Sequence, residues 1–312
     1  MAAPHAIGID IGGTRLRAAL VDRAGTLLAR AETPTLAGEG PAAVIAQIVR
    51  LVEQVGQEAT GEGIAGAGVS SPGPIDTVRG LALGVPTLKG WNGVPIADMI
   101  AEALDLPVTL ENDGIAAANG EWRFGVGRGL TDFVYVTVST GIGGGIVSGG
   151  RLLHGRMGMA GHIGHMTVMI GGERCSCGNA GCWEAYASGT AFARRIGRSG
   201  AAAQDPASVL AAARNGDPQA AELVAEHGDY LGIGIASLLH LFSPQAVILG
   251  GGVSNGLDLL MPAIDRRVRL NAMPAFRDIP VIRAGLGENS GLVGAAALAF
   301  EAAKIDAGKP NY

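Results

Sequence analysis

The sequence predicts an α/β fold, and three observations carry this prediction. Apolar strands alternate with helical segments along the chain, which is typical of α/β proteins. A unit of strand, glycine turn and strand occurs at 6–22 and returns at 133–148, about 125 residues later. Further glycine clusters follow other apolar strands. We interpret the repeated unit as an ancient duplication, with one copy in each of two lobes.

The first part of the chain is expected to begin with a strand meander. AIGIDIGG, RLRAALVD and TLLARAET (6–33) predict three strands joined by glycine turns. The segment 41–56 predicts a helix, because its apolar residues recur at helical spacing. GIAGAGVSSPGPID (63–76) predicts a buried strand that ends in a turn. The apolar residues of the helix are Val44, Ile45, Ile48, Val49 and Val52.

The later part of the chain continues the alternation. FVYVTVSTGIGGGIVSGGRLLHG (133–155) is again expected to form strands separated by glycine turns. Long alanine-rich helices are expected over 207–242. QAVILGGGV (245–253) predicts a strand that enters a glycine turn, and GLVGAAALAFEAAK (291–304) predicts a closing helix.

Length and composition bound the class of protein. Because single cores stop growing near ~250–300 residues, a chain of 312 residues predicts two lobes. We expect a small lobe of 1–118 with 295–312 and a large lobe of 119–294. Hydrophobic residues make up 48% and the net charge is −5, which argues against nucleic-acid or anionic membrane partners. No basic leader or long apolar run is visible, so we expect a cytoplasmic protein.

The first glycine turn has the character of a phosphate-binding loop. Asp10-Ile-Gly-Gly-Thr14 directly follows a buried strand. Gly12 and Gly13 let the backbone approach a bulky anion, and Thr14 offers a hydroxyl group. Asp10 could hold a Mg²⁺ ion through its carboxylate. A simple hairpin turn would explain this loop equally well if it stood alone.

Two further glycine turns strengthen the nucleotide interpretation. Thr140-Gly141-Ile-Gly-Gly-Gly145 repeats the pattern, and Gly250-Gly251-Gly252 ends a strand before a helix over 255–270. A helix N-terminus behind glycines is suited to binding an anion. The sequence contains neither GxxxxGK[ST] nor GxGxxG with an acidic residue ~20 positions on. The P-loop and Rossmann classes are therefore excluded.

A polar pair at another strand end is a candidate catalytic site. TLENDG places Asn112 and Asp113 after an apolar strand and before a helix that starts near Ile115. A carboxylate there could accept a proton from an attacking hydroxyl group, as a general base does. The same aspartate would also suit the N-cap of the helix, which requires no substrate.

The three cysteines all lie within eight residues, in the pattern Cys175-x-Cys177-x₄-Cys182. An odd number of cysteines in a reducing compartment argues against a disulfide framework and for a metal site. Zinc requires a fourth ligand, and free buried thiols are the alternative. Glu173 and the arginines of 194–198 are expected to be solvated surface charges.

Seven motifs together resemble the ROK family of bacterial sugar kinases. They are DIGGT, SPGPID, ENDGIAAANGEW, STGIGGG, GHIGHM, CSCGNAGCWEAYASG and ILGGGVSN, in this order within 8–296. The resemblance implies a hexokinase/actin-type (ribonuclease H-like) fold with two lobes around a cleft. It also implies phosphoryl transfer from ATP with Mg²⁺ to a sugar hydroxyl, and a homodimer. ROK repressors add an N-terminal DNA-binding region, for which DIGGT at residue 10 leaves no room.

The resemblance also implies roles for individual residues. Asp113 would be the general base. His165 would be the fourth ligand of a structural Zn²⁺ ion, within a loop of about 165–184. The sugar would be bound by Gly73, Thr87, Asn112, Asp113, His162, His165 and Glu184. The nucleotide and Mg²⁺ would be bound by Asp10, Gly12, Gly13, Thr14, Thr140, Gly141, Gly251 and Gly252.

Two of these positions depart from the family pattern. The family stretch is usually G-E-x-G-H, and His162 replaces its sugar-binding glutamate. A carboxylate only accepts hydrogen bonds, whereas a neutral imidazole donates one and accepts one. Thr87 stands where the family more often has asparagine. Glucose, N-acetylmannosamine, N-acetylglucosamine, kanosamine or a polyol therefore all remain candidate substrates. A sugar-sensing binding protein and polyphosphate as the phosphoryl donor also stay open.

Overall fold

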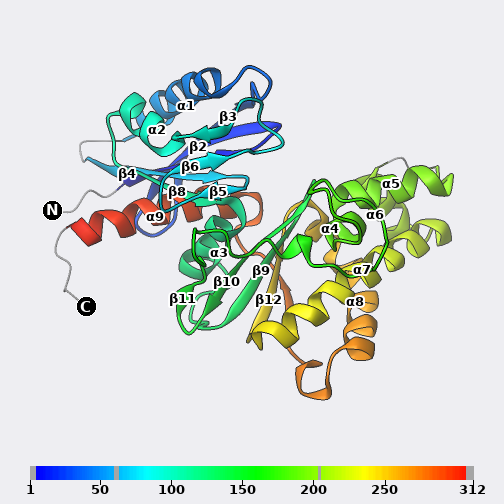
Figure 1. Ribbon diagram of the computed structural model, residues 1–312. Coiled ribbons are helices and arrows are strands. Elements are labelled where there is room, and N and C mark those ends of the chain that lie inside the picture. The colour runs from blue at the N-terminus through cyan, green and yellow to red at the C-terminus, as the bar shows by residue number, and fades with distance from the viewer. Residues whose placement is uncertain (1–4, 60–62, 203–204, 307–312) are drawn as a thin grey trace. The chain divides into compact units, whose positions relative to one another are not determined.

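The computed structural model describes residues 5–59, 63–202 and 205–306 (Figure 1). The chain forms two compact units. The first unit contains the chain up to Gly129, the segment Leu152–Gly161 and the chain from Asn289 onward. The second unit contains Leu130–Arg151 and His162–Glu288.

A five-stranded sheet forms the centre of the first unit, in the order β3-β2-β1-β4-β8. β1 (His5–Ile11), β2 (Arg15–Asp22) and β3 (Leu27–Pro34) form the predicted antiparallel meander. β4 (Ile64–Ser71) pairs parallel to β1, and β8 (Val108–Asn112) pairs parallel to β4. The carboxyl ends of β1, β4 and β8 therefore lie along one edge of the sheet.

Helices cover both faces of this sheet (Figure 1). α1 (Pro41–Gly56) packs on β2 and β3, and α2 (Ile96–Leu104) packs on β8 and α1. The strand isoleucines and the apolar stripe of α1 form one buried cluster. α9 (Ser290–Asp306) packs on β1 and β4 and contacts α3 (Asp113–Phe124).

Glycines in the strands let the backbone of α9 lie directly on the sheet. A Cβ added to Gly8 would fall 2.2 Å from a carbonyl oxygen of α9, and one added to Gly68 would fall 1.7 Å from another. Close approach of a helix to a sheet requires positions of this kind. The start of α9 thereby reaches the strand ends, because a Cβ on Gly291 would lie 3.4 Å from Oδ1 of Asp10.

A small antiparallel sheet completes the first unit. It contains β5 (Ile75–Asp76), β6 (Leu81–Leu83) and β7 (Asn92–Val94). The turns around these strands hold Gly73 and Thr87. Both residues therefore belong to the same unit as the carboxyl ends of β1, β4 and β8.

The second unit contains a sheet of the same construction, in the order β11-β10-β9-β12-β13. β9 (Phe133–Val138) pairs antiparallel with β10 (Ile142–Ser148) and parallel with β12 (Ala246–Gly250). β11 (Arg151–Leu152) forms one edge, and β13 (Val281–Arg283) pairs parallel to β12 at the other. The repeated strand–turn–strand unit seen in the sequence thus begins both sheets.

Helices of the second unit enclose its larger buried cluster. α6 begins behind Asp205, whose carboxylate accepts hydrogen bonds from the backbone of Ala207 and Ser208. The predicted helical stretch is divided at residues 215–217, between α6 and α7. Among the described residues, no helix is both long enough and apolar enough to cross a membrane. The helices are α4 (Glu184–Ala187), α5 (Gly189–Ser199), α6 (Pro206–Arg214), α7 (Pro218–Phe242) and α8 (Leu257–Asn271), with 3₁₀ turns η1 (Ile163–His165), η2 (Gly252–Gly256), η3 (Pro274–Phe276) and η4 (Gly287–Asn289).

Candidate functional site

The aligned strand ends of the first unit bring polar residues into one row. Asp10 of β1 pairs in register with Ser70 of β4, and Ser71 pairs with Asn112 of β8. The hydroxyl of Ser70 donates a hydrogen bond of 2.8 Å to Oδ1 of Asp10. Since these strands are parallel, the predicted residues Asp10 and Asn112 lie at the same edge of the sheet.

Asp113 is the first residue of α3, immediately after β8. Asn112 is the N-cap residue, and its Oδ1 accepts a hydrogen bond of 3.0 Å from the backbone N–H of Gly114. Oδ1 of Asp113 accepts from the same N–H at 2.8 Å. Because Asn112 occupies the N-cap position, helix capping does not account for Asp113.

The surroundings raise the pKa of Asp113 from 3.8 to about 6. Burial is the largest cause, and the nearby charge of Asp10 is the second. The hydrogen bond from Gly114 opposes both effects by stabilising the carboxylate. A general base works best when its pKa lies near the working pH. This carboxyl group is therefore suited to accept a proton near neutral pH.

Arg17 is a residue of this site that sequence analysis missed. It pairs with Asp10 across β1 and β2, and its Nη2 lies 2.5 Å from Oδ2 of Asp10. Nε of Arg17 donates to the same oxygen at 3.1 Å. The alternation of side chains along β2 was the available signal, because it places Arg17 on the same face as Asp10.

The carboxylates fit the divalent cation expected here. Asp10 and Asp113 are close enough for the charge of one to raise the pKa of the other. A hard cation bound by oxygen ligands relieves such repulsion. Arg17 already supplies one positive charge to Asp10. Mg²⁺ would therefore use the remaining lone pairs of Asp10, either directly or through water.

The glycine turn at 12–14 connects β1 to β2. The N–H of Gly12 donates to the carbonyl oxygen of Arg15 at 2.9 Å, so the turn is closed by its own backbone. A Cβ on Gly13 would lie 2.8 Å from Cβ of Thr87. The structure thus places Thr87, predicted as a sugar contact, directly against the predicted phosphate loop. Thr14 is exposed at this turn.

In the second unit, the other two glycine turns lie at neighbouring strand ends. β9 leads to a turn at 139–141 that holds Thr140 and Gly141, whereas the other glycines of the predicted loop 140–145 lie in β10. Gly250 of β12 pairs with Thr137 of β9. Gly251 has a φ of +80°, and a Cβ there would lie 2.4 Å from the carbonyl oxygen of Val138. Glycine is therefore required at Gly251 by both conformation and space. Gly252 is exposed, and a Cβ added there would meet no described residue within 4 Å apart from its chain neighbours.

A hollow of about 460 Å³ lies beside the start of α8, immediately after this glycine turn. Five of its lining residues lie within 254–261, and Arg214 and Arg283 come from other parts of the chain. Arg214 pairs with Asp258 of the same hollow at 2.6 Å, so the hollow holds two arginines and one acidic residue. The lining residues are Arg214, Ser254, Asn255, Leu257, Asp258, Met261 and Arg283.

The predicted metal ligands form a cluster in the second unit. One ligand atom each of His165, Cys175, Cys177 and Cys182 lies within 4.8 Å of all the others. Nδ1 of His165 is 3.6 Å from Sγ of Cys175, and Sγ of Cys177 is 3.6 Å from Sγ of Cys182. Ligands at about 2.0–2.3 Å from one tetrahedral ion would be separated by such distances. The four residues therefore fit a structural zinc ion.

Burial raises the pKa of Cys182 to about 12 and also raises that of Cys175. Both thiols are buried, so the protein alone does not favour their thiolates. Zinc binds thiolates and would supply the missing positive charge. This chemistry favours a metal site over free thiols. Of the two histidines in GHIGH, His165 thus belongs to the metal cluster.

His162 lies just before η1, and its carbonyl oxygen accepts a hydrogen bond of 3.1 Å from the N–H of His165. The two rings are roughly parallel, with centroids 6.1 Å apart. Burial and the neighbouring His165 both lower the pKa of His162. A neutral imidazole in this position can donate one hydrogen bond and accept another.

Glu184 joins two loops of the second unit through its carboxylate. Its Oε2 accepts a hydrogen bond of 2.9 Å from the N–H of Ile142, the first residue of β10 after the glycine turn. Its Oε1 accepts one of 3.1 Å from the hydroxyl of Ser176, between the first two cysteines. A Cβ on Gly141 would lie 2.5 Å from Oε2, so glycine is needed for this approach. A predicted sugar contact therefore also connects the cysteine loop to a glycine loop.

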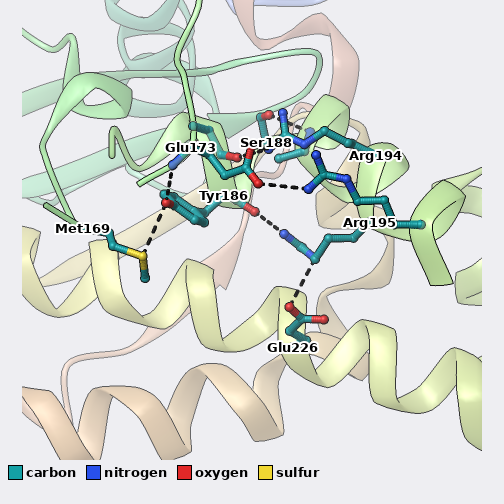
Figure 2. Close-up of polar contacts among 10 residues, drawn as sticks. Met169, Glu173, Tyr186, Ser188, Arg194, Arg195 and Glu226 are labelled. Carbon is teal, nitrogen blue, oxygen red and sulfur yellow. Dashed lines mark hydrogen bonds and ion pairs between the residues drawn. The ribbon is translucent and has the colours of Figure 1, made fainter. Parts of the chain in front are cut away.

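Short helix α4 carries Glu184 and is anchored from both ends. Before it, Trp183 is fully buried against α7 and donates from Nε1 to the carbonyl oxygen of Tyr230 at 2.7 Å. At its other end, Arg194 and Arg195 donate to its carbonyl oxygens, each at 2.6 Å (Figure 2). The expectation of solvated charges is wrong for Arg195, whose side chain is 13% exposed. Burial against α4 and α7 is the reason.

Tyr186 of α4 also holds the cysteine loop (Figure 2). Its hydroxyl accepts a hydrogen bond of 2.6 Å from the N–H of Glu173 and donates one of 3.4 Å to the sulfur of Met169. Glu173 itself pairs with Arg198 on the surface at 2.9 Å, as expected for solvated charges. The cysteine loop is thus fixed to the helix that presents Glu184.

Comparisons with known proteins place these features in a family. The ROK family profile matches residues 6–302. Glucokinase from Streptomyces coelicolor is 36% identical over 316 residues, covering 95% of this chain and 97% of the relative. N-acetylmannosamine kinase from Escherichia fergusonii is 36% identical over 295 residues, covering 94% and 97%.

A solved structure shows the same fold. The ROK glucokinase from Streptomyces griseus, in complex with glucose and AMPPNP, superposes with a TM-score of 0.86. Its sequence is 35% identical, and the match covers 95% of this chain and 99% of the other. The predicted hexokinase/actin-type α/β fold is therefore confirmed. The chain belongs to the ROK family.

Proposed function

We propose that this chain transfers the γ-phosphoryl group of ATP to the 6-hydroxyl of a hexose, an amino hexose or an N-acetylamino hexose. That it is an ATP-dependent sugar kinase follows from its family and from its glucokinase and N-acetylmannosamine kinase relatives. The observation that carries the finer proposal is the placement of Asp113. Its carboxyl group has a pKa of about 6 and lies near Asp10. Asn112, not Asp113, caps α3, so Asp113 is not needed as the helix cap.

In this mechanism Asp113 accepts the proton of the attacking hydroxyl group. The glycine turn at 12–14 would bind the transferring phosphoryl group through its backbone, and Asp10 would hold Mg²⁺. In the second unit, the loop at 140–145 and Gly251–Gly252 support the rest of the nucleotide. Mg²⁺, when bound, neutralises charge on the phosphate oxygens.

We assign the sugar contacts by unit. In the first unit they are Gly73, Thr87 and Asn112, and in the second unit they are His162, His165 and Glu184. The cluster of His165 with the three cysteines is assigned to structural Zn²⁺. Zinc would fix the loop that precedes α4, because Ser176 and Tyr186 connect that loop to Glu184 and α4. The homodimer that the family resemblance implies stays a prediction.

His162 favours an N-acetylamino hexose over glucose as the acceptor. A glutamate can only accept hydrogen bonds from sugar hydroxyls, whereas imidazole N–H can donate to the carbonyl oxygen of an acetamido group. A buried site built for such a hydrogen bond discriminates strongly against sugars that lack the partner. Relatives of both kinds have the same identity to this chain, 36%, so overall similarity does not decide between them.

The test is ADP release with ATP and Mg²⁺ across glucose, mannose, N-acetylmannosamine, N-acetylglucosamine, glucosamine, kanosamine and inositols. We expect the highest kcat/KM with an N-acetylamino hexose, and we expect His162→Glu to shift preference toward glucose. If glucose is the best substrate of the wild type and His162→Glu changes little, His162 does not determine specificity. Sugar binding without turnover of any acceptor would instead indicate a sensing protein.

A further inference from the structure

One segment of the first unit lies, in the sequence, between two segments of the second unit. Residues 152–161, which we call the strap, begin at the last residue of β11 and end just before His162. The strap nevertheless packs in the first unit. Its conformation is defined locally, since the N–H of Ala160 donates to the carbonyl oxygen of His154 at 3.0 Å.

Two contacts hold the strap to the rest of the first unit. At Met157, the carbonyl oxygen accepts a hydrogen bond of 3.3 Å from the N–H of Thr77. Gly158 packs so tightly that an added Cβ would lie 1.8 Å from Oγ1 of Thr77. The second contact joins Nε2 of His154 to Oε2 of Glu111 over 2.9 Å. This second contact leads to the candidate catalytic pair.

Glu111 is a buried carboxylate directly before that pair. Its side chain is 4% exposed, whereas that of His154 is 44% exposed. Oε1 of Glu111 accepts a hydrogen bond of 2.8 Å from the N–H of Asn112. Asn112 in turn caps α3 at Gly114, which also binds Asp113. A continuous series of hydrogen bonds therefore runs from the strap to Asp113.

We propose that His154 is a positioning residue for phosphoryl transfer, which acts by fixing Glu111 and, through it, Asn112 and Asp113. The inference rests on the proposed role of Asp113. A buried carboxylate that loses its partner carries a large desolvation cost, so without His154 the side chain of Glu111 would move toward another donor or toward water. This movement alters its hydrogen bond to Asn112, and small displacements of reacting groups are costly to catalysis.

The charges around His154 give this contact a pH dependence. The hydrogen bond with Glu111 of β8 is the largest cause that raises the pKa of His154, and the charge of Glu301 on α9 raises it as well. Burial acts in the opposite direction. Glu301 is itself paired with Arg123 of α3 at 2.8 Å, and Arg156 is the nearest charged residue along the strap. Because the pKa is raised, the charged contact is complete at low pH and weakens as pH rises through that pKa.

Three variants test the proposal: His154→Ala, His154→Gln and, as a matched control, Arg156→Ala on the exposed part of the same strap. Gln can still donate a hydrogen bond to Glu111 but carries no charge. We expect His154→Ala to lower kcat about 10-fold while each KM stays within about twofold, because the positioned base is used in the transition state. His154→Gln should recover most of kcat, and Arg156→Ala should resemble the wild type.

Two further readouts separate positioning from other roles. As pH rises through the raised pKa of His154, kcat of the wild type should fall because the charged contact with Glu111 is lost, and His154→Gln should lack this fall. Amide hydrogen exchange should become faster at Thr77 and Ala160 in His154→Ala and stay slow in His154→Gln. The exchange measurement needs no substrate, so it remains informative if the proposed function is wrong.

Three outcomes would overturn the proposal. The first is a His154→Ala variant whose kcat and pH profile equal those of the wild type. The second is a change confined to the KM of the sugar or of ATP, which would make His154 a substrate ligand. The third is equal loss of kcat in the Ala and Gln variants with unchanged hydrogen exchange. By contrast, a wild-type protein without turnover of any sugar in the panel would contradict the proposed function itself.

Discussion

The two sheets of this protein have the same strand order, but their strand ends carry different chemistry. In the first unit, the sheet edge holds two carboxylates, and the charge of Asp10 raises the pKa of Asp113. Arg17 pairs with Asp10. In the second unit, the corresponding strands end at glycine turns that contain Thr140–Gly141 and Gly251–Gly252. The carboxylate that contacts the first of these turns, Glu184, belongs to the helix that follows the cysteine loop.

This difference shows how one topology can support two tasks. Carboxylates at a sheet edge hold protons and cations, which is what the reacting end of a phosphoryl transfer requires. Glycine loops present backbone N–H groups, which is what the anionic donor requires. In the second unit, Glu184 of α4 contacts the first glycine turn, and the cysteine loop contacts Glu184 through Ser176. The comparison predicts that damage to the first edge impairs chemistry and that damage to the second impairs nucleotide binding.

The strongest test of this division is Asp113→Asn. Removal of a general base should lower kcat by roughly 10²–10⁴-fold, while the sugar and ATP affinities stay near those of the wild type. Steady-state kinetics and calorimetric titration of each substrate would measure the two effects separately. A variant that keeps most of its rate would show that Asp113 is not the base.

Removal of zinc should have the next largest effect, on the second unit. We expect about one zinc ion per chain by metal analysis, lost in Cys177→Ser because a tetrahedral site with three protein ligands binds weakly. The melting temperature should fall by on the order of 5 °C or more. Chelator-treated wild type, with and without added zinc, is the control. A wild-type protein of normal stability without metal would contradict the assignment.

Much of the fold could be predicted from local patterns in the sequence. The strand meander, the helix at 41–56 and the helix α9 all follow from periodicity and turn residues. The cysteine spacing indicated the metal cluster, because ligands on one loop lie close in sequence as well as in space. These features are determined by residues that are near one another along the chain.

The contacts that the sequence did not reveal depend on strand register or on how separate segments pack. Arg17 and Asp10 meet only through strand register, and Glu184 reaches Ile142 across 42 positions. His154 meets Glu111 because the strap packs in the first unit, which nothing in the sequence of the strap indicates. Arg195 was expected on the surface, and the burial of its side chain depends on how α5 and α7 pack.

Glu184 offers a test of intermediate size, because two roles are proposed for it. Glu184→Ala should weaken ATP binding in the absence of sugar about 10-fold, since the N–H of Ile142 loses a charged acceptor. Glu184→Gln should bind ATP within about threefold of the wild type, because its amide oxygen can accept from Ile142 and its amide N–H can donate to Ser176. Calorimetric titration with ATP measures both. Unchanged ATP affinity in Glu184→Ala would limit this residue to sugar binding.

The smallest predicted effect concerns Arg17 and the pH profile. Arg17 offsets the charge of Asp10, and Asp10 raises the pKa of Asp113. Without Arg17 the charge of Asp10 acts more strongly, so the pKa of Asp113 should rise further above about 6.

A general base must be deprotonated, so activity rises with pH through this pKa. In Arg17→Ala the rise in kcat/KM should therefore occur at a higher pH, by about half a unit to one unit. Arg50 is an exposed arginine of α1, distant in sequence from Arg17, and Arg50→Ala is therefore the charge-matched control. A shift toward lower pH would mean that Arg17 does not act through Asp10. An identical shift in the control would trace the effect to overall charge rather than to the paired carboxylates at the first sheet edge.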